Sequence, residues 1–310
     1  MLIRVLGSAA GGGFPQWNCN CRNCADVRAG KPGLEARTQS SLAVSATGRD
    51  WLLLNASPDL RQQINDAPAL GAAPSGKLRN SPLKAVVVTN GDVDHVAGLI
   101  NLREAQPLNV YASPRVLATL DANTIFNVMS RDFVARRELP FATPVEIDGA
   151  DGPLGLTIEA FDVPGKVALY LEDAKAGPGF GSQKGDTIGL KVSAPGTGRH
   201  FYYIPGCANL DAALRDRLKG APLVFFDGTL YTEDEMLRQG LMQKTGTRMG
   251  HMNISGDNGS IAAFETLGVR RKIFIHINNS NPVLDENSAA RKAAEAAGWE
   301  VSYDGMEVRL

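Results

Sequence analysis

The sequence predicts an α/β fold in which two mixed β-sheets pack face to face and helices cover their outer faces. Near the N-terminus, strand patterns follow one another closely, as in β-hairpins, and further along they alternate with helical patterns. The chain has 310 residues, of which 44% are hydrophobic, and this is enough to build a sizeable core. It contains no internal repeat and no low-complexity linker. We therefore expect a single domain over residues 1–310, arranged as a four-layer αββα sandwich.

Each predicted strand is a short run of apolar, β-branched or aromatic residues that lies between turn residues. Residues 2–6 precede a glycine-rich turn, and residues 85–88 form an unbroken apolar run that is typical of a strand buried on both faces. We expect strands at 2–6, 41–46, 51–55, 85–89, 108–111, 156–161, 167–171, 187–193, 200–204, 223–226, 272–276, 300–303 and 306–310.

Each predicted helix shows apolar residues at intervals of three and four, which is the period of a helix with one buried face. Ser255 and Asp285 are N-cap candidates for two of the helices, and Gly268 and Gly298 are expected to end them. We expect helices at 58–64, 96–105, 114–121, 210–219, 232–238, 255–267 and 286–297.

Charge and hydropathy exclude several classes of partner. The net charge is −1, so no basic face dominates, and this argues against non-specific binding to nucleic acid or to a membrane surface. The apolar residues at 1–6 are too few for a signal sequence, and no later run approaches the roughly 20 apolar residues that span a bilayer. We therefore expect a cytoplasmic protein.

Three of the four cysteines, Cys19, Cys21 and Cys24, lie within six residues in a loop at 17–25. In a cytoplasmic chain, clustered thiols favour a metal over a disulfide. Three thiolates at this spacing can occupy three corners of a Zn²⁺ tetrahedron, and a site with mostly thiolate ligands is structural. The alternative is a chance cluster of reduced cysteines. The sequence leaves the fourth ligand open among Cys207, Asn279, His200 and water.

Polar side chains also occur repeatedly where strands end. Asp94 and His95 follow the strand at 85–89, Asp227 follows 223–226, and His276 ends 272–276, while His251 lies in a loop. Loops that leave the same edge of a sheet converge in space, so these side chains are expected to meet. A carboxylate and imidazoles at such a junction can bind one metal ion.

The residues 89–95 carry a family resemblance. Asn90 to His95 is similar to the His-x-His-x-Asp-His signature of the metallo-β-lactamase superfamily, although two histidine positions are Asn90 and Asp92. Further motifs occur in the same order as in one branch of that superfamily, the coenzyme PQQ synthesis B (PqqB) family, and the resemblance spans nearly the whole chain. These motifs are the glycines at 11–13, the cysteine cluster, Asp227-Gly228-Thr229, Gly250-His251 and His276-Ile277-Asn278-Asn279.

The resemblance implies roles for particular residues. Asp94, His95, Asp227 and His276 would bind the active-site metal, and His251 would act as a general acid or base. From the chemistry of the residues themselves, His251, or Asp92 through a nearby water, could complete or tune that site. The cysteine cluster would bind a structural Zn²⁺, and Asn279 stands where a relative has its fourth zinc ligand.

The ligand set and the resemblance together indicate a reaction. Two imidazoles with carboxylates and open positions are typical of non-haem Fe(II) oxygenases. The family resemblance implies an Fe²⁺- and O₂-dependent hydroxylase, on this fold, that acts on the tyrosine ring of a PQQ precursor derived from Glu and Tyr. Another divalent metal is an alternative. A second alternative is a metal-dependent phosphodiesterase-type hydrolase, but Asn90 and Asp92 replace histidines that would bind the first of its two metals. A third alternative is a non-catalytic carrier of PQQ or its precursor. Helices on the outside leave room for a homodimer.

Overall fold

The computed structural model describes residues 1–74, 77–177 and 179–310, and this part of the chain forms two β-sheets of seven strands each. The first sheet is mixed. Neighbouring strands pair antiparallel on the side of the sheet that holds both chain ends, and they pair in parallel on the other side. In order across the sheet, they are β14 (Glu307–Arg309), β1 (Leu2–Gly7), β2 (Ser41–Ser45), β3 (Trp51–Leu54), β4 (Leu83–Val87), β5 (Leu108–Ala112) and β6 (Val134–Glu138).

The second sheet is mixed in the same way, with parallel pairing at one side and antiparallel pairing at the other. In order across the sheet, its strands are β13 (Trp299–Val301), β12 (Lys272–Ile275), β11 (Val224–Asp227), β10 (Arg199–Ile204), β9 (Ile188–Ala194), β8 (Gly152–Asp162) and β7 (Val145–Gly149).

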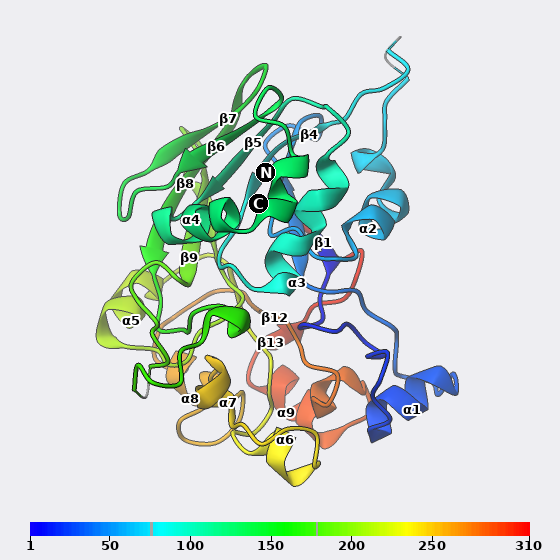
Figure 1. Ribbon diagram of the computed structural model, residues 1–310. Coiled ribbons are helices and arrows are strands. Elements are labelled where there is room, and N and C mark those ends of the chain that lie inside the picture. The colour runs from blue at the N-terminus through cyan, green and yellow to red at the C-terminus, as the bar shows by residue number, and fades with distance from the viewer. Residues whose placement is uncertain (75–76, 178) are drawn as a thin grey trace.

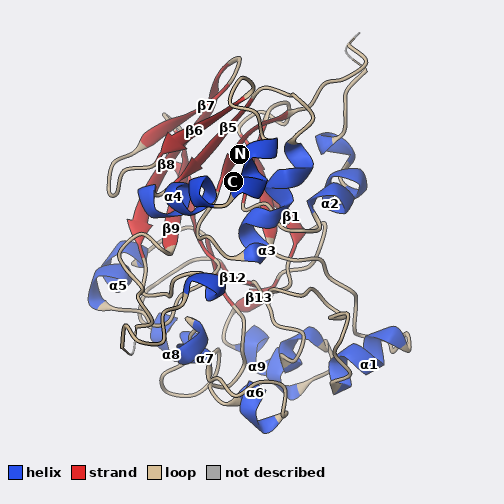
Figure 2. Cartoon of the chain, in the orientation of Figure 1, coloured by secondary structure: helices blue, strands red, loops and turns tan. Residues whose placement is uncertain are grey.

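Short helices join these strands. Most of the strands gather in the upper half of Figure 2, and the lower half holds mainly helices and loops. The α-helices are α1 (Arg22–Arg28), α2 (Leu60–Asp66), α3 (Val93–Val96), α4 (Pro114–Ala122), α5 (Ala212–Leu218), α6 (Glu235–Arg238), α7 (Gly246–Met249), α8 (Ser260–Phe264) and α9 (Ala289–Ala296). The 3₁₀ turns are η1 (Pro68–Leu70), η2 (Ala97–Leu102), η3 (Thr124–Val128), η4 (Leu169–Leu171) and η5 (Pro282–Leu284).

Three buried clusters define the layers. One lies between the sheets and combines side chains of both, among them Val5 and Leu156. A second packs α2 and α4 on the outer face of the first sheet. The third packs α5, α8 and α9 on the outer face of the second sheet. Because alternate side chains of a strand point to opposite faces, each sheet serves two of these clusters. The predicted four-layer αββα sandwich is confirmed.

The two ends of the chain are tied together. β1 pairs with β14, and the N-terminal amino group of Met1 donates a hydrogen bond to the carbonyl oxygen of Leu310 at 2.9 Å. The N-terminal helix α1 also lies beside the C-terminal segment that contains α9 (Figure 1). Asn23 Nδ2 donates to the carbonyl oxygens of Asn279 and Asn281 there. The cysteine loop is therefore held by residues from the far end of the sequence.

Most predicted strands are confirmed, but the one at 167–171 is wrong. That segment is a loop followed by η4, and Leu169, Tyr170 and Leu171 are exposed. Its apolar residues have no sheet neighbour. Tyr170 Oη instead donates to the carbonyl oxygen of Gly91 at 2.8 Å, which places the segment against the loop after β4. The sequence pattern missed β6 and β7, because edge strands with many charged residues lack the apolar pattern of a strand.

The predicted helices differ mainly at their boundaries, and α1 and α7 were not predicted. The helix expected at 96–105 is α3 followed by the 3₁₀ turn η2, where Gly98 N donates to Ala56 O at 2.9 Å. The predicted N-caps Ser255 and Asp285 are wrong, since Gly259 and Ser288 begin α8 and α9. Ser288 Oγ accepts from the backbone N–H of Arg291, as an N-cap should.

The predicted helix ends fare differently. Gly298 follows α9 with φ of 76°, as expected of a residue that ends a helix in the left-handed region. Gly268 also has a positive φ, but α8 already ends at Phe264.

The topology decides where the strand ends meet. β11 and β12 are parallel neighbours in which Asp227 pairs with Ile275, so Asp227 and His276 leave the same edge of the second sheet. Among the described residues, no helix combines the length and the apolar character needed to cross a bilayer.

Substitution of Trp299 tests how strongly packing on the outer face of the second sheet stabilises the fold. Its ring stacks on Phe274 with centroids 3.9 Å apart and is 2% exposed, whereas Trp17 is 87% exposed. Trp299→Ala should lower the free energy of unfolding by about 3–5 kcal/mol, because it empties a large buried volume. The matched control Trp17→Ala should change it by less than about 0.5 kcal/mol. Equal losses in denaturant unfolding would contradict this packing.

Candidate metal centre

Three polar side chains meet where strands of the two sheets end. Asp94 and His95 lie in α3, which follows β4 of the first sheet, and His276 follows β12 of the second. The Nε2 atom of His276 lies 3.0 Å from Oδ2 of Asp94, and Nε2 of His95 lies 3.9 Å from the same oxygen. One carboxylate and two imidazoles therefore face one another across the junction of the sheets.

The backbone of His276 is strained in this position. Its φ is 60°, which is in the left-handed region that few non-glycine residues adopt. Neighbouring hydrogen bonds hold it there: Ile277 N donates to Ser8 O, and Ala10 N donates to Ile277 O, each at 2.9 Å. Such strain persists only where the surroundings fix it, and it is common at functional sites.

Within the described part of the chain, one ring nitrogen of His95 has no hydrogen-bond partner. The side chain is buried, Nδ1 lies 3.5 Å from Thr89 Oγ1, and Nε2 has no hydrogen-bond partner. Burial is the main cause that lowers the pKa of His95 to about 4, so its imidazole is neutral at neutral pH. A buried polar atom without a partner is costly, and a metal ion would satisfy it.

Asp94 carries the negative charge of the group. Burial by itself raises the pKa of this carboxyl, but the adjacent imidazoles of His95 and His276 outweigh burial and hold the pKa well below its usual range. Burial also opposes protonation of His276, but the hydrogen bond and charge of Asp94 outweigh it and raise the pKa of His276. A positive charge, either a proton or a metal ion, is thus stabilised between Asp94 and His276.

Thr229 orients the imidazole of His276. Its Oγ1 lies 2.6 Å from Asp227 Oδ1 and 2.9 Å from His276 Nδ1. A hydroxyl has one proton to donate, and the carboxylate takes it, so Oγ1 accepts from the Nδ1–H of His276. This arrangement leaves Nε2 of His276 directed at Asp94. Hydrogen bonds of this kind fix the tautomer of histidines that bind metals.

Asp227 and His251 form a second pair in the same place. Asp227 is fully buried, and its Oδ2 accepts from Cys207 N at 2.9 Å and lies 2.7 Å from His251 Nδ1. The ring of His251 stacks on that of His276 with centroids 5.1 Å apart. Because Nδ1 of His251 faces a carboxylate, we assign the ring proton to Nδ1, and the predicted role of His251 as a general acid or base stays a prediction.

The predicted ligands thus form two overlapping groups. Asp94, His95 and His276 have ligand atoms within 4.8 Å of one another, and so have Asp227, His251 and His276. Both oxygens of Asp227 already accept hydrogen bonds, whereas Nε2 of His95 has no partner. The first group therefore fits a metal ion, and the metal-binding role of Asp227 stays a prediction.

Asn90 and Asp92, at the positions of the missing histidines, hold the loop. Asn90 Oδ1 accepts from Asp92 N, and Asp92 Oδ1 accepts from Leu169 N, each at 2.9 Å. Burial and then the nearby charge of Asp94 raise the pKa of Asp92. These contacts tie the segment of η4 to the loop after β4, and the predicted catalytic role of Asp92 stays a prediction.

Asp94, His95 and His276 line a cavity of about 590 Å³. Two lysines, Lys166 and Lys244, line the same cavity as the carboxylates and imidazoles. The sequence pattern had marked neither lysine, because each takes its place only through the fold. Thr229 was marked only as part of the Asp227-Gly228-Thr229 motif, without a role of its own. Apolar side chains complete the lining, among them Leu169, Met236, Leu241, Met242 and Met249.

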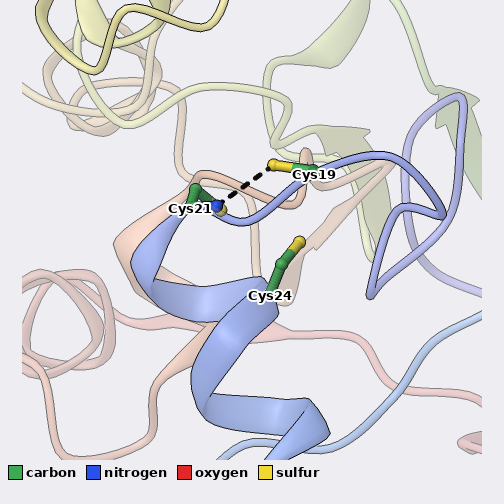
Figure 3. Close-up of side chains that lie close together, drawn as sticks. All are labelled: Cys19, Cys21 and Cys24. Carbon is green, nitrogen blue, oxygen red and sulfur yellow. Dashed lines mark hydrogen bonds between the residues drawn. The ribbon is translucent and has the colours of Figure 1, made fainter.

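The three clustered cysteines converge at the start of α1, as Figure 3 shows. The Sγ atoms of Cys19, Cys21 and Cys24 lie within 4.8 Å of one another, and all four cysteines of the chain are described as free thiols. Burial raises the pKa of Cys21 to about 12, while hydrogen bonds from Cys21 outweigh burial at Cys19 and lower its pKa. Three sulfur atoms at this separation fit a zinc ion, which binds them as thiolates.

Asn279 occupies the fourth side of this cluster. Its Nδ2 lies 3.1, 3.6 and 3.3 Å from the sulfur atoms of Cys19, Cys21 and Cys24. A half-turn of the amide would place Oδ1 there, and an amide oxygen can accept where nitrogen donates. The role of Asn279 as a zinc ligand stays a prediction.

The other candidates for the fourth ligand lie elsewhere. Cys207 Sγ donates to the carbonyl oxygen of Asn209 at 3.0 Å and is outside the cluster. His200 packs edge-on against Tyr202 in the second sheet. His200 is therefore outside the cysteine cluster as well.

Comparison with known proteins agrees with the motifs. A model of the beta-lactamase superfamily domain matches residues 50–277. A coenzyme PQQ synthesis protein B from Gluconacetobacter diazotrophicus is 54% identical over 305 residues, which cover 98% of each chain. Another from Methylobacterium nodulans is 50% identical over 99% of each chain.

A solved structure agrees as well. Zn²⁺-bound PqqB from Methylobacterium extorquens superposes with a TM-score of 0.92 at 46% identity, and all of each chain is covered. The family predicted from the motifs is confirmed over the full length of the chain. With its αββα sandwich and with side chains at the strand ends that could hold a metal ion, the chain belongs to the coenzyme PQQ synthesis protein B family of the beta-lactamase superfamily.

Proposed function

We propose that this chain is a metal-dependent enzyme of PQQ biosynthesis, and that it hydroxylates the tyrosine ring of a precursor derived from Glu and Tyr with Fe²⁺ and O₂. The names of its relatives support the pathway. The superfamily fold supports a metal-dependent enzyme.

One observation carries the choice of chemistry. Nε2 of His95 and Nε2 of His276 lie 3.9 and 3.0 Å from one oxygen of Asp94. Two imidazoles and one carboxylate, with the remaining positions open, are the ligand set typical of non-haem Fe(II) oxygenases. An Fe²⁺ ion held by these residues would supply the reaction with O₂ that no side chain can perform.

Residues around Asp94, His95 and His276 would transfer the proton, orient the ligands and bind the aromatic ring. His251, fixed by Asp227, is placed to accept the proton of a substrate phenol and to return it. Thr229 keeps His276 in the tautomer that binds metal. The apolar side chains of the cavity suit an aromatic ring and exclude water from it.

Asn90 and Asp92 favour this chemistry over hydrolysis. Hydrolases with two metals hold the ions about 3.5–4 Å apart and need strong ligands for both. Here Asn90 Oδ1 and Asp92 Oδ1 accept backbone hydrogen bonds within the loop and beside η4. These contacts support a site for one ion.

Removal of either imidazole should abolish iron binding. His95→Ala or His276→Ala should lower Fe²⁺ affinity at least about a hundredfold. Each substitution deletes a residue that binds the metal directly, which costs more than deleting a hydrogen-bond partner of such a residue. Iron content after anaerobic loading and gel filtration measures this, with circular dichroism to check the fold. The control His200→Ala should bind iron like the wild type. Full iron retention by either site variant would contradict the assignment.

Oxygen uptake tests the reaction itself. We expect Fe²⁺-loaded protein to consume O₂ when given a Glu–Tyr dipeptide and a two-electron reductant, since one oxygen atom enters the ring and the other leaves as water. Mass spectrometry should find a product heavier by one oxygen atom, and His276→Ala should form none. If the zinc-loaded protein instead hydrolysed a phosphodiester and no O₂ were consumed, the hydroxylase proposal would be rejected.

The cysteine cluster should retain zinc independently of the active site. Cys24→Ser should remove about one equivalent of zinc from protein whose active site holds iron, because it deletes one of three thiolates. It should also lower the melting temperature, since metal binding contributes to folding. Cys207→Ser, whose sulfur lies outside the cluster, is the control and should keep the metal. Equal zinc content in both variants would show that the cluster is not the zinc site.

A further inference from the structure

Glu172, just after η4, is surrounded by three cations. Arg248 holds it with two contacts, Nη2 to Oε2 at 2.7 Å and Nη1 to Oε1 at 3.2 Å. The Nζ atom of Lys166 lies 3.1 Å from Oε1, and that of Lys244 lies 3.6 Å from Oε2. The side chain of Glu172 is only 11% exposed, so these contacts are partly shielded from water.

The cluster carries more positive charge than Glu172 needs. The hydrogen bond from Arg248 is the main cause that lowers the pKa of Glu172 to about 2, so the carboxylate is ionised at neutral pH. A bidentate arginine pair neutralises a carboxylate by itself. Arg248 is also fixed by the ring of Phe180, which lies 3.3 Å below its guanidinium carbon. The charges of Lys166 and Lys244 are therefore in excess.

Lys166 is held close to the candidate metal centre. Its backbone is fixed on both sides, since Thr187 Oγ1 donates to Lys166 O at 3.0 Å and Val167 N donates to Ser182 Oγ at 2.8 Å. Its side chain packs over Gly250, the residue before His251, where a Cβ atom would lie 3.0 Å from Lys166 Cγ. The stem of the lysine thus lies along the backbone that leads to His251.

The two lysines and the metal-binding group line one cavity. Lys166 and Lys244 make one part of that lining attract anions, while apolar side chains such as Met236 and Leu241 carry no charge. An elongated substrate with an aromatic ring and carboxylates is therefore oriented by charge. Arg248 is not among the residues that line the cavity, so it can keep Glu172 paired while the lysines turn to a ligand.

We infer that Lys166 and Lys244 form a subsite that binds the carboxylates of the substrate and so directs its phenol ring to Asp94, His95 and His276. This inference rests on the proposed function for the identity of the substrate, and on the charge excess for the site. Glu172 keeps the two lysines side by side until a ligand binds, and Arg248 keeps Glu172 paired when they turn to it.

Binding without turnover tests the subsite. Iron-loaded protein under argon is titrated in a calorimeter with the Glu–Tyr dipeptide and with its dimethyl ester, which keeps the ring but removes the carboxylate charges. The wild type should bind the dipeptide at least about tenfold more tightly than the ester, since hydrogen bonds to charged groups contribute this much. Lys166→Gln with Lys244→Gln should remove the preference and leave ester binding unchanged.

Two controls separate charge from structure. Lys166→Arg keeps the charge and should keep the preference. Lys219→Gln removes an exposed lysine at the end of α5, outside the cavity, and should behave like the wild type. Thermal unfolding of the double variant should match the wild type within a few degrees, because Arg248 still neutralises Glu172. A wild type without preference for the dipeptide, or a double variant that keeps it, would overturn the subsite.

The oxygen assay distinguishes this inference from the function on which it rests. Lysine-dependent binding without O₂ uptake would leave the subsite standing and reject the hydroxylase. O₂ uptake in the double variant with an unchanged KM for the dipeptide would reject the subsite and leave the hydroxylase standing.

Discussion

The contact between Asp94 and His276 is the interaction on which the site depends, because it joins the two sheets at the edge where their strands end. Asp94 comes from α3, which follows β4, and His276 directly follows β12, and their side-chain atoms lie 3.0 Å apart. Both are largely buried, so a charge placed there must be balanced locally. His95 adds an imidazole whose Nε2 atom has no hydrogen-bond partner among the described residues. Asp94, His95 and His276 therefore form a buried site that stabilises a positive charge.

A second set of contacts holds that place rigid. Thr229 contacts Asp227, His251 and His276 through one hydroxyl, and Asp227 in turn accepts from the backbone N–H of Cys207. Each histidine is thereby fixed in orientation and tautomer before any ligand binds. Such preorganisation is what a metal site needs, because a ligand that must be ordered on binding reduces the affinity.

The cysteine cluster couples the first part of the chain to the loop that carries His276. Asn279, three residues after His276, contacts all three sulfur atoms of the cluster. Asn23, between two of the cysteines, donates to the carbonyl oxygen of Asn279. A metal bound by the cysteines would thus stiffen the same loop that holds the strained backbone of His276. Structural and catalytic metals would share one support.

By itself, the sequence determined the class of fold, most strands, the cysteine cluster and the residues Asp94, His95, His251 and His276. It did so because buried strands are visible in the sequence as short apolar runs. The polar residues that directly follow such runs can therefore be identified as candidate ligands. Only the tertiary structure decided how these residues are grouped. It showed that His95 has a free nitrogen while both oxygens of Asp227 are occupied, and that Asn90 and Asp92 hold a loop. It also placed Lys166 and Lys244 around Glu172, although neither lysine lies in any motif. Contacts between residues far apart in the chain leave no pattern in a single sequence, because they arise only when the sheets pack and bring loop ends together.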